Sequence, residues 1–310
     1  MRGRKIGAVA GMILLGAVGC MKAERTVAVQ MAVQTDGGGD AVPIWRPFSA
    51  PTLVTGLASD TTDVHGSSLT GDETEIYFSC VLQGEGYYHI WTSTRAARNA
   101  PWNTATMVAE LYSAYNEQDP DVSPDGKTIY FASDRLGAGY QLYVSQRTAR
   151  GQTWGSPTLA PELVSSSLDF REPSVDPSGL FMTFCAASRG SENFSLYSAS
   201  RTDTDPLGAW GDVQQLSGIN SDRADADPAL FHDSLSLIWS SRAPSNGKSW
   251  DLVEVSRPDP VTPFSAVSTT LGSLNTNLSD RHPWVSQDGS HILFSREAVG
   301  APGVLYEAWR

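Results

Sequence analysis

Five titratable side chains recur at one position of an internal repeat in this chain of 310 residues, and such side chains can bind a ligand or a cation. They are His65, Asp119, Glu172, Asp227 and His282, and each of the last four precedes a proline. A second set lies two residues earlier and comprises Asp63, Glu117, Asp225 and Asp280. Divalent cations take carboxylate and imidazole ligands from proteins, and calcium takes oxygen ligands. The two sets therefore predict a ligand site or a calcium site, if the fold brings them together.

The same residues also have a structural interpretation, which we favour because a position repeated in every unit usually serves the architecture. A carboxylate before proline can accept backbone N–H bonds from the neighbouring unit. The chain has no Gly-x-Ser-x-Gly, His-Glu-x-x-His or Cys-x-x-Cys motif, so no catalytic residue is predicted. Paired carboxylates keep a glycoside hydrolase, or a lectin with a site at the same place, as an alternative.

The elements that position these residues are short strands in a repeat. In the four copies with proline an aromatic residue follows it by eleven positions, whereas in the first copy it follows Gly66 by twelve. The aromatic residues recur at intervals of 53, 53, 55 and 55 residues and are Phe78, Phe131, Phe184, Trp239 and Phe294. In each unit a turn rich in Asp and Gly joins the first strand to the second strand, which carries the aromatic residue. Each unit therefore begins with a tight hairpin.

A third and a fourth strand complete each unit. The third strand is followed by an arginine in every copy: Arg95, Arg147, Arg201, Arg257 and Arg310. The fourth begins with an aromatic residue, which is Trp102, Trp154, Trp210 or Phe264. Four short strands are one blade of a propeller, and neighbouring blades must stack to bury their faces. The loops between strands carry further aromatic residues, predicted to serve a partner surface: Tyr87, Tyr88, Tyr115, Tyr140, Phe170 and Trp250.

The last unit ends at Arg310 after its third strand, and the segment 48–57 supplies the fourth. This segment, FSAPTLVTGL, matches WGSPTLAPEL at 154–163 with the same spacing. An N-terminal strand that completes the last blade would close the ring and hide its sheet edges. The fold class predicted is all-β: a five-bladed β-propeller of four-stranded antiparallel blades, closed by an N-terminal outer strand.

One segment carries a resemblance to a known family. It runs from Asp119 through Ser123-Pro-Asp-Gly126 to Arg135. It resembles the TolB-like (WD-type) β-propeller repeat, and the resemblance covers roughly residues 45–310. It implies a non-enzymatic protein that binds another protein, or a polysaccharide of the cell envelope, on a propeller face. A carbohydrate-active protein and a cation-stabilised structural propeller remain the alternatives.

The first residues have the layout of a bacterial lipoprotein signal. A basic start and a short apolar stretch fill residues 1–19, and Ala17-Val-Gly-Cys20 resembles a lipobox. Residues 20–44, with a Gly-Gly-Gly run, are predicted to be the lipidated Cys20 and a flexible tether. Acyl chains on Cys20 would anchor the protein in a membrane. We expect an exported protein, at the outer membrane and facing the periplasm or the surface.

Charge and cysteine usage narrow the partners. Without the three basic residues of the signal, 19 Lys and Arg face 34 Asp and Glu, so the mature chain is near −15. Nucleic acid requires a basic footprint, so it is excluded as a partner. Cys80 and Cys185 fall on different units and are expected to be buried thiols without a disulfide.

Overall fold

The computed structural model describes most of the chain beyond residue 45. The residues described are 32–33, 43–44, 46–57, 63–81, 84, 86–242, 249–265 and 269–310. The predicted signal and Cys20 lie outside them. Strands β1 (Ala32–Val33) and β2 (Pro43–Ile44) pair antiparallel within the segment predicted as a tether. In the described part of the chain every regular element is a strand, and none is a helix suited to crossing a membrane.

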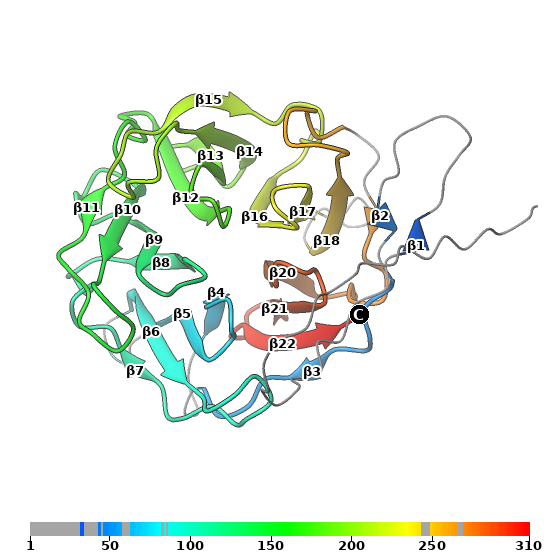
Figure 1. Cartoon of the computed structure of the whole chain (residues 1–310), viewed down its shortest axis with the longest axis horizontal. Coiled ribbons are helices and arrows are strands. Elements are labelled where there is room, and N and C mark those ends of the chain that lie inside the picture. Colours follow the sequence, from blue (N-terminus) through cyan, green and yellow to red (C-terminus); the bar gives the residue numbers. More distant parts are fainter. Residues whose placement is uncertain are drawn as a thin grey trace, which may run out of the picture. The chain divides into compact units, whose positions relative to one another are not determined.

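Five four-stranded antiparallel sheets stand around a central axis as the blades of a propeller (Figure 1). Blade 1 consists of β4 (Val64–Leu69), β5 (Glu75–Val81), β6 (Tyr88–Thr94) and β7 (Thr106–Met107). Blade 2 consists of β8 (Glu117–Val122), β9 (Thr128–Ser133), β10 (Gln141–Gln146) and β11 (Thr158–Leu159). Blade 3 consists of β12 (Leu168–Val175), β13 (Phe181–Ser188), β14 (Ser195–Ser200) and β15 (Gly211–Gln215). Blade 4 consists of β16 (Asp225–Phe231), β17 (Ser236–Arg242), β18 (Trp250–Ser256) and β19 (Thr269–Thr270). The predicted fold class is confirmed.

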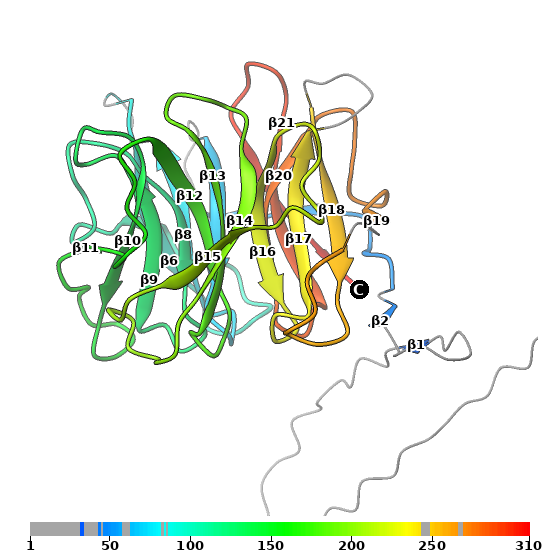
Figure 2. The same cartoon turned by 90° about the horizontal axis from the view of Figure 1, so that it is seen from above.

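Blade 5 is closed by the N-terminal strand, as the sequence predicted. It consists of β20 (Ser279–Val285), β21 (His291–Glu297), β22 (Val304–Trp309) and β3 (Thr52–Leu53). Beyond the two ladder pairs, Ser49 N donates to Trp309 O at 2.7 Å and Val54 N to Leu305 O at 3.0 Å. The first and last strands of the ring therefore share one sheet. Figure 2 shows the blades side-on, with the strands running from one face of the ring to the other.

The repeated arginine ties the hairpin turn of each blade to the aromatic residue that precedes its fourth strand. Its Nε donates to a backbone carbonyl in the first turn at 2.6–2.8 Å: Glu73, Gly126, Gly179, Ser234 and Gly289. Its guanidinium lies 4.2–4.5 Å from an aromatic ring: Trp102, Trp154, Trp210, Phe264 and Phe48. Both contacts recur in all five blades. Four of the five rings are buried, and Trp102 is partly buried.

The hydrophobic core lies between neighbouring blades. The repeated second-strand aromatic residues are at most 1% exposed. One cluster joins Tyr77 and Ile90 of blade 1 to Ile129 and Phe131 of blade 2. A single blade cannot cover its own faces, so this core exists only when the ring is assembled. That assembly sets the positions of the innermost strands β4, β8, β12, β16 and β20 around the axis.

Candidate functional site

A β-bulge in each innermost strand sets the position of the residue before proline. Its φ lies between 52° and 56° in blades 2 to 5, at Asp119, Glu172, Asp227 and His282. In blade 2 the ladder pairs Gln118 with Ala132 and then Asp121 with Tyr130, so Asp119 and Pro120 are the extra residues. A bulge with a left-handed residue re-aims its side chain. Here it directs the side chain into the channel.

The equivalent residue in blade 1 is Gly66, which corrects the predicted alignment. The ladder pairs His65 with Ser79 and Ser68 with Tyr77, and Gly66 has a φ of 56°. Ser67 therefore takes the place of proline, eleven residues before Phe78 as in the other copies. His65 shares its register with Gln118, not with Asp119. The prediction of a titratable residue at this position in all five blades was wrong. Blade 1 lacks the proline that marks the bulge, so the sequence alone did not locate it.

Two of the four carboxylates and imidazoles at this position tie blades together. Glu172 Oε2 accepts a hydrogen bond from Asp227 N at 2.6 Å and another from the Cys185 thiol at 2.7 Å. Asp227 accepts from His282 N at 3.3 Å, and Arg281 holds both of its oxygens at 3.1 and 3.2 Å. The favoured structural interpretation is therefore confirmed for Glu172 and Asp227.

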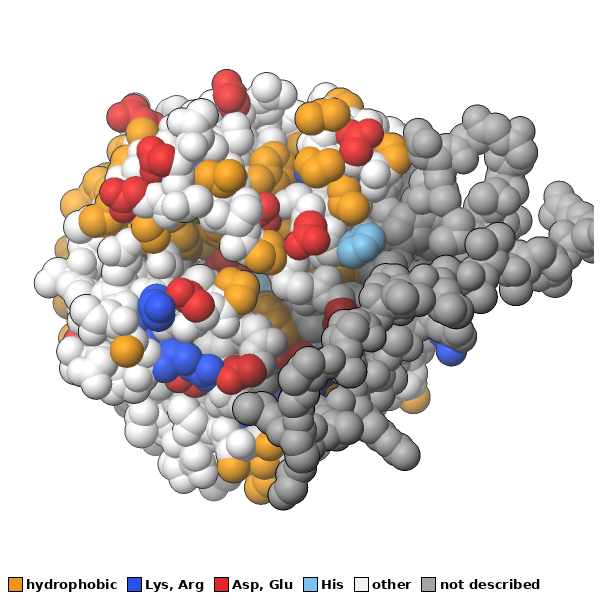
Figure 3. Space-filling view, viewed as in Figure 1, with side chains coloured by type: hydrophobic (Ala, Val, Ile, Leu, Met, Phe, Trp, Pro, Cys, Tyr) orange, Lys and Arg blue, Asp and Glu red, His pale blue; other side chains and the backbone are white. Residues whose placement is uncertain are grey.

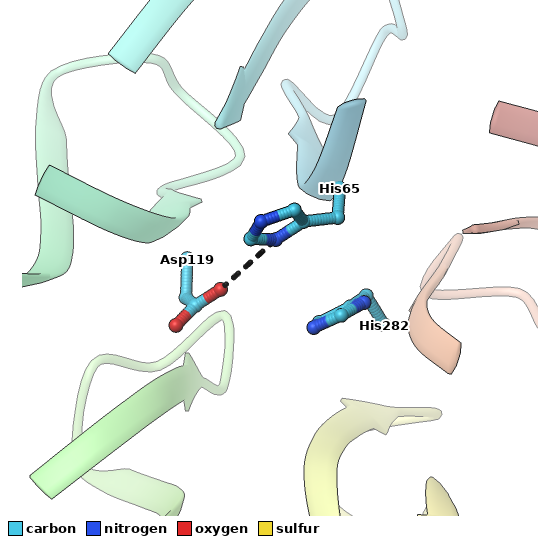
Figure 4. A group of neighbouring side chains, drawn as sticks. All are labelled: His65, Asp119 and His282. Atoms are coloured by element: carbon cyan, nitrogen blue, oxygen red, sulfur yellow. Dashed lines mark ion pairs between the residues drawn. The ribbon is translucent and has the colours of Figure 1, made fainter. Parts of the chain in front are cut away.

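The other two, Asp119 and His282, converge with His65 on one point without such bonds. His65 from β4, Asp119 from β8 and His282 from β20 point toward one another in the channel (Figure 4). His65 Nδ1 lies 3.8 Å from Asp119 Oδ1, and the rings of His65 and His282 stack with centroids 4.7 Å apart. All three residues are 7–8% exposed. We call the five residues His65, Asp119, Glu172, Asp227 and His282 the neck.

Three of the four carboxylates of the second predicted set do not reach the channel. Glu117, Asp225 and Asp280 are at most 1% exposed, and each binds the residue four positions earlier: Ser113, Ser221 and Thr276. Arg135 and Arg296 pair with Glu117 and Asp280 of their own blades at 3.2 and 2.6 Å. These carboxylates hold the loop that leads into each blade, so their prediction as channel ligands was wrong.

Asp63 is one position out of register with that set and does line the channel. The ladder aligns Val64, not Asp63, with Glu117, since Val64 pairs with Cys80 and Glu117 with Ser133. Asp63 accepts hydrogen bonds from the Tyr88 hydroxyl and, at 2.6 Å, from Gly303 N. It therefore joins blade 1 to the last loop of blade 5 at the rim of the channel.

The three neck carboxyls differ in pKa because they are buried beside different charges. Burial raises the pKa of Asp119 to about 7, against the opposing effect of Arg171, and raises that of Glu172 well above its ordinary value. Burial opposes ionisation of Asp227 too, but Arg281 holds the pKa of this carboxyl well below its usual range. Burial thus favours the protonated form of Glu172, whereas Arg281 favours the ionised form of Asp227.

The two imidazoles are neutral at neutral pH. Burial lowers the pKa of His65 to about 4, although the charge of Asp63 opposes this shift. Burial also lowers the pKa of His282 well below its ordinary value, against the effect of Asp227. Neutral imidazoles keep a lone pair for a hydrogen-bond donor or a metal ion.

One end of the channel is a polar cavity of about 260 Å³. Besides the neck residues His65, Asp119, Glu172 and His282, its lining includes Asp63, Tyr88, Arg171, Glu192, Phe194, Arg281 and Glu297. We call these seven residues the charged mouth. The Arg171 guanidinium stacks 3.7 Å from the ring of Tyr140 and 5.5 Å from that of Phe194. The cavity therefore offers both charges and aromatic faces to a ligand.

The opposite end is a cavity of about 370 Å³ with a different lining. Its walls include Pro120, Pro173, Pro228 and Pro283, and its floor is formed by the neck carboxylates and His282. The two cavities share Asp119, Glu172 and His282, so they meet at the neck. Figure 3 shows one face of the ring, with a central depression lined in part by hydrophobic side chains.

The predicted aromatic partner surface is only partly present. Tyr87 and Tyr115 are 42% and 41% exposed. Phe170 lies in β12 and Trp250 in β18, and both are buried, so their prediction as loop residues was wrong. The predicted burial of the cysteines is confirmed, because Cys80 and Cys185 are 2% and 0% exposed.

Sequence reasoning missed two arginines of the site. Arg171 and Arg281 share the register of His65, one residue before the pre-proline position. With the bulge correctly placed, the sequence would have shown that His65, Arg171 and Arg281 occupy the same position of their blades. The first copy has no proline to mark its bulge, so its residues were aligned one position out of register with the other copies.

Comparison with known proteins identifies the fold and not a family. No protein-family model and no curated protein sequence matches the chain. Among solved structures it resembles a thermostable family-43 glycoside hydrolase, with a TM-score of 0.56 and 14% identity over 83% of this chain and 91% of that one. It also resembles Zg3597, a family 117 glycoside hydrolase from Zobellia galactanivorans, with a TM-score of 0.59 and 14% identity over 85% and 90%.

A TolB structure is similar to about the same degree. TolB from Acinetobacter baumannii aligns with a TM-score of 0.51 and 14% identity, covering 80% of this chain and 54% of that protein. This chain thus corresponds to about half the length of that TolB. The predicted propeller is confirmed, and likenesses at this level of identity establish the fold alone.

Proposed function

We propose that this chain is a non-enzymatic, lipid-anchored protein of the bacterial cell envelope, and that its charged mouth binds another envelope component, most simply a second protein. The observation that carries the proposal is the charged mouth itself. It brings Asp63, Glu192 and Glu297 together with Arg171 and Arg281 around one cavity. Both charges beside aromatic rings suit a polar side chain or a sugar unit inserted by a partner.

The neck carboxylates support a binding role over hydrolysis. A glycoside hydrolase places a general acid and a second carboxylate on either side of the scissile bond, about 5–9.5 Å apart. Ligand atoms of Glu172, Asp227 and His282 all lie within 4.8 Å of one another, and these two carboxylates are 8% and 3% exposed. Glu172 accepts a hydrogen bond from Asp227 N, so its carboxylate is already engaged in a contact between blades.

The experiment is capture of partners by the full chain from detergent-solubilised envelopes of cells that express it. Glu192→Lys alters the exposed rim of the charged mouth, and Asp125→Lys makes the same charge change in the exposed turn between β8 and β9. We expect a stoichiometric partner that Glu192→Lys loses and Asp125→Lys retains. Equal capture by both variants, or no partner at all, contradicts the proposal.

The anchor is tested separately. Cells fed a labelled fatty acid should label the full chain and not its Cys20→Ser variant. Label on both chains, or on neither, contradicts lipidation at Cys20.

A carbohydrate-active enzyme is the second candidate, and one observation favours it. Environments that push apart the pKa values of neighbouring carboxyls are typical of acid–base pairs, and Glu172 and Asp227 show this pattern. A screen of aryl glycosides and polysaccharides with the full chain, and with Glu172→Gln as control, tests it. Turnover that this substitution abolishes would replace the binding role by hydrolysis.

A further inference from the structure

Three polar atoms at the neck, two imidazole nitrogens and one carboxylate oxygen, are buried without a hydrogen-bond partner in the described part of the chain. They are His65 Nδ1, Asp119 Oδ1 and His282 Nδ1. Buried polar atoms of this kind are rare in native proteins, and each one calls for a partner such as a water or an ion. The three side chains come from different blades and point at one another (Figure 4).

The spacing of these groups suits one small cation. A metal ion about 2.1 Å from each of two tetrahedral ligands holds the ligand atoms about 3.4 Å apart. His65 Nδ1 and Asp119 Oδ1 lie 3.8 Å apart, and one ligand atom from each of His65, Asp119 and His282 lies within 4.8 Å of the others. Small side-chain rotations therefore bring all three to bonding distance.

The surroundings supply the second shell that metal-bound imidazoles require. A ligating histidine usually presents its other ring nitrogen to a carboxylate or a carbonyl. His282 Nε2 lies 3.5 Å from Asp227 Oδ1, and Nδ1 lies 3.8 Å from Glu297 Oε1. Whichever nitrogen binds the ion, the other faces a carboxylate.

Glycine at position 66 keeps the cluster open. A Cβ on Gly66 would lie 2.7 Å from Asp119 Oδ1. The other blades carry a carboxylate or an imidazole at this position, so blade 1 alone leaves room there. The Asp119 carboxylate therefore has room beside Gly66, where it faces His65.

Of the two nearby arginines, Arg281 is paired with a carboxylate, whereas the positive charge of Arg171 still acts on Asp119. Arg281 forms a bidentate pair with Asp227, and Arg171 stacks on Tyr140. Asp63 and Glu297 add negative charge on the same side of the neck. A cation at the neck therefore meets compensating carboxylates.

We propose that the neck binds one divalent transition-metal ion, of which Zn²⁺ is the type, with His65, Asp119 and His282 as its protein ligands. Two imidazoles and one carboxylate suit zinc, cobalt or nickel, whereas calcium takes oxygen ligands. The neck is thus a transition-metal site and not the calcium site expected from the acidic residues alone. A fourth position remains for water or for a group entering from the charged mouth.

The ion would also stabilise the ring. Its ligands come from blades 1, 2 and 5, and blades 5 and 1 meet where the chain closes on itself. An ion that binds only the folded chain stabilises it by mass action. The metal site does not depend on the proposed partner, because a chain can lose the metal and still capture the partner.

The test uses the full chain without a histidine tag, stripped with a chelator and titrated with Zn²⁺ and Ca²⁺ in a calorimeter. We expect one equivalent of Zn²⁺, no Ca²⁺, and a rise in melting temperature on the order of 5 °C at hundredfold excess over Kd. His65→Gln and His282→Gln should each weaken Zn²⁺ binding more than about tenfold.

His232→Gln is the matched control, since His232 lies in the turn between β16 and β17. It should leave Zn²⁺ binding unchanged. Circular dichroism without metal checks that each variant is folded.

The absorption spectrum of the Co²⁺-loaded wild type identifies the ligands without any substitution. We expect d–d bands of a nitrogen and oxygen site and no sulfur charge-transfer band, since the Cys185 thiol bonds to Glu172. No zinc binding by the folded wild type, binding that survives both histidine substitutions, tighter binding of Ca²⁺, or a sulfur band would each overturn the assignment.

Discussion

Closure of the ring by residues 48–57 can be tested by removing one side chain, Phe48. Its ring is 4% exposed, packs in the cluster that holds Leu274 and Ile292, and lies 4.3 Å from the Arg310 guanidinium. Truncating a buried phenylalanine to alanine costs about 3–5 kcal/mol, and the lost cation–π contact falls within this range. A domain of ordinary stability has about 5–15 kcal/mol in total, so the loss is large.

The chain provides two matched comparisons for Phe48→Ala. Leu53 lies on β3 itself but is 49% exposed, so Leu53→Ala should change the free energy of unfolding by no more than about 0.5 kcal/mol. Trp154 occupies the position of Phe48 in blade 2, where its ring is 6% exposed and 4.5 Å from Arg147. Trp154→Ala should cost about as much as Phe48→Ala, because both rings anchor a fourth strand in the same way.

Urea unfolding followed by tryptophan fluorescence, with linear extrapolation to water, measures all three variants in the full chain. We expect a large and similar loss for Phe48→Ala and Trp154→Ala and almost none for Leu53→Ala. If Phe48→Ala costs no more than Leu53→Ala, the N-terminal strand does not close the ring in solution, and the reasoning from the repeat fails.

Three further predictions follow from other contacts. Burial would raise the pKa of Glu75, but two arginines of the next blade hold this pKa below its ordinary value. The ionised carboxylate therefore stabilises the fold above about pH 4.5, and this stabilisation is lost as the pH falls through the folded pKa. The difference in free energy of unfolding between wild type and Glu75→Gln should therefore shrink as the pH falls from about 6 to about 3, and a constant difference contradicts this. Gly66→Ala should destabilise the chain by more than Gly190→Ala. Both glycines have a positive φ, but only a Cβ at position 66 would press against a neck carboxylate. Equal melting temperatures of the two variants would show that this contact relaxes. The Cys185 thiol is fully buried and its pKa is raised well above the ordinary value, mainly by burial, so a thiol reagent should modify it only after unfolding, and rapid labelling of the native chain would contradict this.

Most of the fold could be predicted from the sequence because the repeat carries the information several times over. The aromatic spacing predicted the second strands, and each arginine after a third strand proved to bind its own blade's first turn. The match between residues 48–57 and 154–163 predicted the pairing of β3 with β22. These are local patterns, and local patterns survive in a linear sequence.

The candidate site was less predictable, because its residues acquire their roles from blades far apart in the chain. The sequence placed His65 with Asp119 in one ring position, whereas the ladder shifts it by one residue. Nor could the sequence tell Glu172, bonded to the backbone of blade 4, from Asp119, whose Oδ1 has no hydrogen-bond partner. A one-residue shift reverses the face of a strand, so it decides which side chains meet.

The amino-acid sequence by itself therefore determined the number of blades, the order of their strands and the strand that closes the ring, since these follow from periodicity and turn chemistry. The tertiary structure alone decided that His65, Asp119 and His282 converge while Glu117, Asp225 and Asp280 turn into their own blades. The physical reason is the bulge. In blades 2 to 5 it re-aims one side chain per blade, whereas in blade 1 it falls on Gly66 and His65 reaches the channel from the preceding residue. Only the assembled ring brings these side chains together around a common axis.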